Sequence, residues 1–431
     1  MYQAESSRVP LGHRGLRAGA ASGRGGRVSR NVVVLGAVSM LTDVSSEMVS
    51  AILPIYLVFA LGASPLQYGV VDGIYQGASA LVRLLSGFVA DRWRRHKDVA
   101  AAGYGLSAAC KAALVAIGGT VSAVTAIVLV DRTGKGIRTA PRDALIALSS
   151  TPATLATAFG VHRAMDTAGA LLGPLLAFGL LLLAPARFDA VFVVSVCFAV
   201  VGLAVLLLFA DGHPRERDDQ AGIERTVDAG GRTRPTLREA IALLGERRFR
   251  VLVGIAAVLA IATISDGFIY LGLQRTLDLS LTAFPLLFVG AALVYMALAI
   301  PAGRLADRLG RTRVFLGGYA LLLPVYAVLL VPSAGLVALI FALLALGAYY
   351  AATDGVLQAI ASALLPDRLQ ASGLALLVTA ISLAKLISSL AFGLVWTLGG
   401  LDAAAAAFTA ALVAALMLAG WALARSPEAI A

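Results

Sequence analysis

The stretch VSAVTAIVLVDRTGKGIRTAPRDALIAL, residues Val121–Leu148, decides the fold class, because it combines the length of a membrane-spanning helix with a row of charges. Four of these charges recur at intervals of 4, 3 and 4 residues: Asp131, Lys135, Arg138 and Arg142. Residues with this spacing share one face of a helix. Because a charge in hydrocarbon costs about 2.5–3.5 kcal/mol on insertion scales, this face should turn toward a bundle interior or a water-filled cavity.

The composition of the whole chain indicates a polytopic membrane protein. Of its 431 residues 59% are hydrophobic, and the mean hydropathy is +0.87, which is too apolar for a soluble multidomain protein. The net charge of +10 does not indicate nucleic-acid binding, because the excess lies in the N-terminal tail and in short loops beside apolar runs. Such loops are typically cytoplasmic, so we expect a plasma-membrane protein with both termini in the cytoplasm.

The sequence offers little for chemistry other than transport. Cys110 and Cys197 each lie in an apolar run, and no cluster of His, Cys and carboxylates has metal-ligand spacing. No phosphate loop or nucleophile motif can be placed either. We therefore expect no metal, no cofactor and no enzyme activity.

We predict an all-α membrane protein of twelve transmembrane helices in two six-helix bundles. The spans are expected at 31–61, 66–90, 98–118, 121–148, 155–184, 188–210, 250–276, 281–303, 313–332, 334–361, 367–397 and 401–425. The predicted domains are a disordered basic cytoplasmic tail (1–30), a first bundle (31–210), a central cytoplasmic linker (211–249), a second bundle (250–425) and a short cytoplasmic tail (426–431).

A charged loop pattern after the second span recurs after the eighth, as GFVADRWRRHK (87–97) and GRLADRLGRTR (303–313). Its glycines would allow close helix approach, and its charges would form a network that opens and closes with the two halves. The alternative is that these loops only set the orientation in the membrane. The gating candidates are Gly87, Asp91, Arg92, Arg95, Arg142, Asp143, Gly303, Asp307, Arg308 and Arg311.

This duplicated loop resembles the signature of the major facilitator superfamily, and the resemblance covers about residues 31–425. It implies alternating access with a binding site between pseudo-symmetric halves. Arg132-x-x-x-Gly136 is similar to the family's fourth-helix pattern, which is associated with proton coupling. Gly160-x8-Gly169-x3-Gly173-Pro174 is similar to the fifth-helix pattern of antiporters, which implies that these four residues serve helix packing.

Acidic residues inside the spans are candidates for carrying protons. Asp43 and Glu47 are four residues apart on one face of the first span, and two like charges in a low dielectric favour protonation of one of them. Asp166 and Asp266 are further candidates. The alternative for Asp43 and Glu47 is permanent pairing with Arg132 or Lys135.

Basic residues inside the spans are candidates for binding the substrate: Arg132, Lys135, Arg138, Arg163 and Lys385. We expect Arg138 to pair with Asp166 across the fourth and fifth spans. His162 is expected to be a structural hydrogen-bonding residue, and Lys111 and Asp72 are expected near span ends or on peripheral helices.

The predicted function is proton-coupled efflux, by antiport, of a small anionic or zwitterionic solute. The expected partners are this solute, protons and membrane lipids, with no nucleic acid and with a monomeric protein. Open alternatives are a symporting importer or a multidrug exporter of the same fold, and, from another class, a transporter-like sensor or a lipid-handling membrane enzyme.

Overall fold

The computed structural model describes residues 28–93, 95–117, 119–151, 154–212, 242–331, 335–366 and 369–425, except for the side chains of residues 80, 81, 83–93 and 371. Residues 1–27 of the predicted N-terminal tail, the whole C-terminal tail and most of the predicted linker lie outside these ranges. Before the linker the helices are α1 (Arg30–Ile55), its π-helical continuation η1 (Tyr56–Ala60), α2 (Pro65–Trp93), α3 (His96–Ile117), α4 (Val121–Leu148), α5 (Leu155–Leu183) and α6 (Phe188–Phe209). After it come η2 (Leu243–Gly245), α8 (Arg247–Ile261), α9 (Asp266–Leu277), α10 (Pro285–Leu309), α11 (Arg311–Ala320), α12 (Leu322–Leu330), α13 (Leu336–Leu364) and α14 (Gln370–Ala424).

The fold is that of an all-helical membrane protein. Within the described ranges, 9 helical segments are long and apolar enough to cross a membrane. α4 is not among them, and it carries the six charged residues that the sequence shows. α14 joins the last two predicted spans, and its backbone leaves the helical conformation at Gly400, where φ is +85°. The count of twelve spans remains a prediction.

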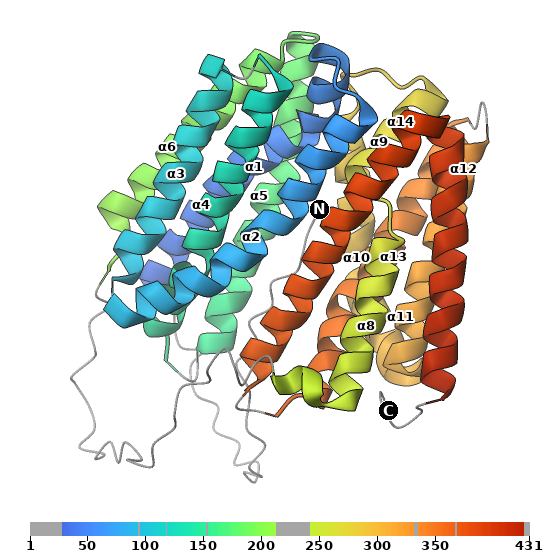
Figure 1. The fold of residues 1–431 in the computed structure, drawn as a ribbon. Coiled ribbons are helices and arrows are strands. Elements are labelled where there is room, and N and C mark those ends of the chain that lie inside the picture. Colours follow the sequence, from blue (N-terminus) through green and yellow to red (C-terminus); the bar gives the residue numbers. More distant parts are fainter. Residues whose placement is uncertain are drawn as a thin grey trace.

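The helices before and after the linker form two groups that lie side by side (Figure 1). In the first group α1 packs on α5 and α6, while α4 packs on α2 and α3. In the second group α13 packs on α10 and α11, and α14 packs on α8 and α12. Contact between the groups runs through α2 with α14 and through α5 with α10, so these pairs connect the two groups.

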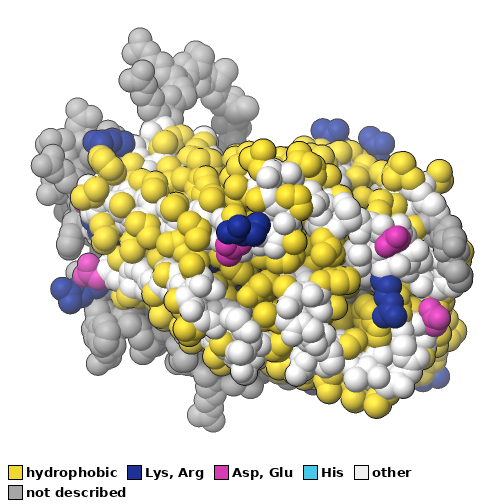
Figure 2. All heavy atoms as spheres, turned by 90° about the horizontal axis from the view of Figure 1, so that it is seen from above, with side chains coloured by type: hydrophobic (Ala, Val, Ile, Leu, Met, Phe, Trp, Pro, Cys, Tyr) yellow, Lys and Arg dark blue, Asp and Glu magenta, His cyan; other side chains and the backbone are white. Residues whose placement is uncertain are grey.

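Few charged side chains lie at the end of the molecule opposite the linker, which shows mostly hydrophobic and uncharged polar side chains (Figure 2). At the linker end the start of α1 is tied to the ends of α4 and α6, because Asn31 Nδ2 donates to Ser149 Oγ at 2.7 Å and Asp211 N donates to Asn31 Oδ1 at 2.8 Å. These polar contacts hold the ends of α1, α4 and α6 together at the linker end.

Glycines bring α2 and α14 into backbone contact. A Cβ added at Gly69 would lie 2.5 Å from the carbonyl oxygen of Ser389, and one at Gly73 would lie 3.1 Å from that of Leu386. Gly77, one turn further along α2, meets the side chain of Leu386. Only residues without a side chain allow helices to approach so closely, so this stripe sets the spacing of the two groups.

The seventh predicted span, 250–276, is broken rather than continuous. α8 ends at Ile261 and α9 begins at Asp266. The backbone between them is buried, and side chains from other helices bond it: Tyr326 Oη accepts from Ile264 N at 2.8 Å, and Ser388 Oγ donates to the Thr263 carbonyl at 2.5 Å. Non-helical backbone at membrane depth needs such internal partners.

Candidate functional site

The charged face of α4 divides into two clusters, and the charged residues of the first cluster pair with one another. Asp131 Oδ1 accepts from Lys111 Nζ of α3 at 2.7 Å, and Asp131 Oδ2 accepts from Arg132 Nη2 at 2.6 Å. The guanidinium of Arg132 also lies 4.0 Å from the ring centroid of Tyr75 on α2. Arg132, a predicted substrate residue, is therefore held by its neighbours. Lys111 does not snorkel to the surface, since only 3% of its surface is exposed, and it pairs locally with Asp131 of the neighbouring helix.

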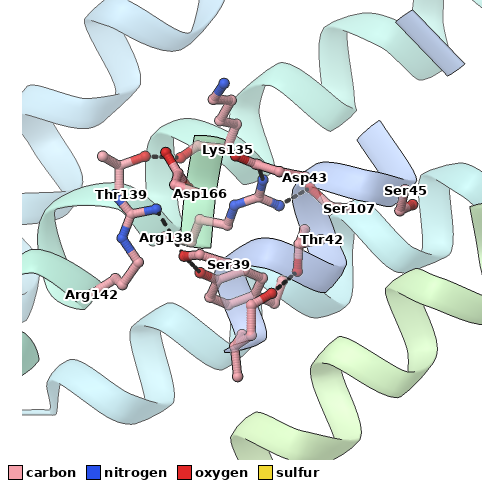
Figure 3. Close-up of polar contacts among 12 residues, drawn as sticks. Ser39, Thr42, Asp43, Ser45, Ser107, Lys135, Arg138, Thr139, Arg142 and Asp166 are labelled. Atoms are coloured by element: carbon pink, nitrogen blue, oxygen red, sulfur yellow. Dashed lines mark hydrogen bonds and ion pairs between the residues drawn. The ribbon is translucent and has the colours of Figure 1, made fainter. Parts of the chain in front are cut away.

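The second cluster joins α1, α3 and α4 around Arg138 (Figure 3). Its guanidinium lies 4.0 Å from Asp43 Oδ1, donates to Ser107 Oγ at 3.1 Å, and lies 4.7 Å from the ring centroid of Tyr104. The expected pair of Arg138 with Asp166 is not what the structure shows. The ion pair of Asp166 is with Arg163 on its own helix, at 3.7 Å.

Asp166 lies instead against Asp43. The two carboxyl groups, one from α1 and one from α5, are close enough to interact electrostatically. Two carboxyl groups that share a buried site favour a state in which one of them holds a proton. The structure thus brings together two of the predicted proton-coupling residues, next to the cation Arg138.

Lys135 and Glu47 lie beside this pair without joining it. Neither forms an ion pair with any residue that the structure describes, and the Lys135 side chain extends away from Arg138 and Asp166 (Figure 3). The alternative of a permanent ion pair with Arg132 or Lys135 is thus not seen among the described residues, although Asp43 interacts electrostatically with Lys135 and Glu47 with Arg132. Lys135 therefore lies near the pair without an ion-pair partner among the described residues.

The predicted gating residues are partly described. Arg142 pairs with Asp143 at 2.9 Å and donates to Ser39 Oγ at 3.2 Å. In the second loop Arg311 pairs with Asp307 at 3.3 Å and donates to the Ala359 carbonyl of α13 at 3.4 Å, so this loop ties α10 to α13. Gly310, with φ at +96°, makes the turn between α10 and α11.

Other members of the two loops contribute less. Arg95 pairs with Asp98 at 3.1 Å on the surface, and Arg308 is exposed. Gly303 does not serve close packing, because an added Cβ would meet no atom within 4 Å. The surroundings of Gly87 and the side chains of Asp91 and Arg92 lie outside the described part.

The fifth-helix glycines pack α5 against α1 at two of three positions. Gly169 meets the backbone of Met40, and a Cβ at Gly173 would lie 2.8 Å from Glu47 Cβ. Pro174 is buried inside α5. Gly160 is exposed with no neighbour within 4 Å of an added Cβ, so its predicted packing role is wrong.

The second group of helices contributes Asp266 and Lys385. Asp266 begins α9 after the helix break, and its Oδ1 accepts from Tyr350 Oη at 2.5 Å. Lys385 lies half-buried on α14 and forms no ion pair with a described residue. Neither residue touches the Asp43–Asp166 pair in the contacts described, so the predicted site residues do not form one cluster.

Asp72 is a residue that the sequence analysis misplaced. Its carboxylate is buried, and Oδ2 accepts from Ser389 Oγ of α14 at 2.5 Å, so it bridges the two helix groups. Asp72 and Asp266 line one small cavity of about 30 Å³, together with Ser50, Tyr68 and Gln76. The repeated glycines of α2 could have indicated this interface.

His162 is not the structural hydrogen-bonding residue that was expected. Both of its ring nitrogens are buried, and neither has a partner among the described residues. Over the same residues the structure contains no group of three or more His, Cys, Asp and Glu side chains that could hold a metal ion.

Comparison with known proteins places these features in a family context. The family model described as Major Facilitator Superfamily matches residues 35–271 and 251–431. An uncharacterized MFS-type transporter of Methanocaldococcus jannaschii is 30% identical over 378 residues, which cover 86% of this chain and 89% of that protein. An uncharacterized protein of Mycobacterium tuberculosis is 37% identical over 152 residues, or 35% of this chain and 37% of that protein.

Two solved structures share the fold. A mutant of the nucleoside transporter NupG has a TM-score of 0.75 at 15% identity, with 91% of this chain and 100% of that chain covered. A mutant of the peptide transporter POT with sulfate has a TM-score of 0.73 at 17% identity, with 93% and 95% covered.

Proposed function

The chain belongs to the major facilitator superfamily of membrane transporters, and from this premise we propose that it is a proton-coupled secondary transporter that exports a small zwitterionic solute by antiport. It works by alternating access between two six-helix halves. The linker and both termini face the cytoplasm of a cell whose plasma membrane holds the protein as a monomer among its lipids.

The observation that carries this proposal is the Asp43–Asp166 carboxyl pair beside Arg138. One proton between two carboxyl groups leaves a single negative charge, which Arg138 balances. Loss of that proton leaves two carboxylates beside Arg138 and Arg163, and a cationic group of the solute can then take the place of the proton between them. Proton and cationic group compete for the same oxygens, which is the requirement for antiport.

The anionic end of the solute has its own candidate ligand. Lys135 lies one turn from Arg138 on α4 and has no ion pair with a described residue. A carboxylate or phosphate on the solute would form an ion pair with Lys135. A solute with an ammonium near Asp43 and an anion near Lys135 is a zwitterion. The Gly/Pro pattern of the fifth helix separately supports antiport.

Contacts at the end opposite the linker support an inward-facing state. There the Asp72–Ser389 bond joins α2 and α14, Leu66 N donates to Thr397 Oγ1 at 2.9 Å, and the rings of Tyr68 and Phe268 lie 4.7 Å apart. Breaking these contacts while new ones form at the linker end would expose the site to the other side.

A second candidate follows from the Asp43–Arg138 distance of 4.0 Å. If the substrate is a plain anion, protonation of Asp43 would release Arg138 to bind it. Proton and anion would then move together, which is symport. The direction of proton movement on addition of solute separates this importer from the antiporter.

The test is transport into proteoliposomes that contain a pH-sensitive dye, with a panel of zwitterions, anions and lipophilic cations. We expect zwitterions to drive proton movement in the opposite direction. Asp43→Asn and Asp166→Asn should each lower this proton-coupled flux about 100-fold or more, and Lys135→Gln should weaken binding of the solute.

Glu47→Gln is the matched control, because Glu47 is the neighbouring carboxylate of α1 that does not join the pair. The proton-coupled flux of this variant should persist. Full coupling in Asp43→Asn would remove the proposed carrier. A preference for lipophilic cations, unaffected by Lys135→Gln, would identify a multidrug exporter. Binding without flux would indicate a sensor, and turnover of a lipid headgroup would indicate an enzyme.

A further inference from the structure

His162 is a buried histidine that the coupling mechanism described above does not use. It lies on α5 with 4% of its surface exposed, and neither ring nitrogen has a hydrogen-bond partner among the described residues. A buried polar atom without a partner costs about 1–3 kcal/mol. Two such atoms on one ring call for an explanation, because a histidine that only fills the core keeps its nitrogens bonded.

Another buried atom without a described partner lies one turn away on the same helix. It is Oδ1 of Asp166, the member of the carboxyl pair that α5 contributes. Four residues of α-helix rise roughly 6 Å, a distance that one water can bridge between a ring nitrogen and a carboxylate oxygen. Because α5 starts at the linker end, His162 lies on the linker side of Asp166.

The charges that face His162 suit the transient passage of a proton. Arg142 of α4 lies near it, together with Arg163 and Asp166 of α5 itself. α1, α6 and α10 also pack against α5, and within the described part none of them brings a further charged group to the imidazole. Two cations and one carboxylate therefore face the imidazole, and the carboxylate belongs to the proposed proton-carrying pair.

We propose that His162 relays protons between the linker side and the Asp43–Asp166 pair, an inference that rests on the proton coupling proposed above. A proton from linker-side water binds one ring nitrogen and forms an N–H bond there. The other nitrogen releases its own proton through a bridging water to Asp166 Oδ1, where an O–H bond forms. The imidazole is left neutral in its other tautomer, and a ring flip restores the first.

One test needs no substrate. The chain has only four histidines, so protein labelled with ¹⁵N-histidine in lipid nanodiscs gives few ring signals, and His162→Gln identifies the one from His162. If His162 relays protons, its ring signals should show exchange between the two tautomers. This exchange should change in Asp166→Asn, and it should remain as in the wild type in the control His96→Gln. One fixed tautomer from about pH 5 to about pH 9, unaffected by Asp166→Asn, would overturn the proposal.

A second test measures flux of the solute that the panel identifies. His162→Gln should slow proton-coupled net flux about tenfold or more, leave solute exchange at equal pH unchanged, and recover part of its flux when a small weak acid such as formate is added. His96→Gln should keep wild-type rates. A wild-type protein that moves solute without protons contradicts the proposed function, whereas full coupling in His162→Gln contradicts the relay alone.

Discussion

Asp131 holds together the buried charges of α3 and α4. It accepts from both Lys111 and Arg132, and all three side chains are almost fully buried. Two cations share one carboxylate, so the members of the cluster are not equivalent. Removal of either cation leaves a neutral pair, whereas removal of the anion leaves two cations without a partner.

This asymmetry predicts different losses of stability. Asp131→Asn should lower the free energy of unfolding by about 3–5 kcal/mol, because it leaves uncompensated buried charge. Lys111→Met should cost clearly less, since Asp131 and Arg132 still neutralise each other and methionine fills a similar volume. Thermal unfolding of both variants in the same detergent measures the difference. Equal losses would show that the cluster is not held by its charges.

The residues of the coupling site show which part of a pairing can be predicted. Helical spacing placed Asp43 on an inward face and Arg138 on the charged face of its span, and the structure brings these two together. The expected partner of Arg138 was Asp166, which lies one helix further away. The spacing of residues along the chain determines on which face of its helix a residue lies. Its partner depends on how the neighbouring helix is rotated and how deep it lies in the membrane.

At the scale of the helices, α5 packs on α1 through Gly169 and Gly173. At Gly173 an added Cβ would meet Met48 N and the Val44 carbonyl, each at 2.9 Å. Backbone atoms cannot rotate away as a side chain can, so the two helices would have to separate. Gly160, on the same helix, has open space beside it.

These two glycines make a matched pair of variants. Gly173→Ala should destabilise the protein by about 1–3 kcal/mol through overpacking. Gly160→Ala should be neutral or should stabilise it by about 0.5–1 kcal/mol, because alanine is the better helix former. Thermal unfolding and solute flux, measured for both, check this. A stable and active Gly173→Ala variant would contradict the close packing of α5 on α1.

At the scale of the whole molecule, the bond between Asp72 and Ser389 closes the end opposite the linker. It joins α2 to α14, whose backbones already touch through glycines, so the contact needs no long side chain to reach across. A hydrogen bond to a charged group contributes about 1.5–3 kcal/mol. This is enough to move a two-state equilibrium roughly tenfold or more.

Ser389→Ala should therefore shift the protein toward opening at that end. Spin labels at Ser64→Cys and Asp402→Cys, in a protein whose two native cysteines are replaced by serine, would report a larger population of long distances. The matched control is Ser195→Ala, which removes the 2.9 Å bond to Ser45 inside one helix group and should leave that population unchanged. Identical distance distributions in all variants would show that the Asp72–Ser389 bond does not control closure.

The sequence alone determined that this is a polytopic membrane protein, because hydropathy and loop charge depend only on local order along the chain, and its duplicated loop indicated the family by resemblance. It also placed cations in the fourth span and carboxylates in the first. The broken seventh span was not foreseen, since its backbone is stabilised by Tyr326 and Ser388 from distant helices.

Only the tertiary structure decided which charges are partners. Their positions along the chain predict that Lys111 and Asp72 lie near span ends or on peripheral helices, yet both side chains are buried against residues of other helices. The free energy of a charge in a membrane protein depends on which groups surround it, and packing between helices sets those groups. The charged face of α4 is thus one stripe in the sequence and two separate clusters in the fold.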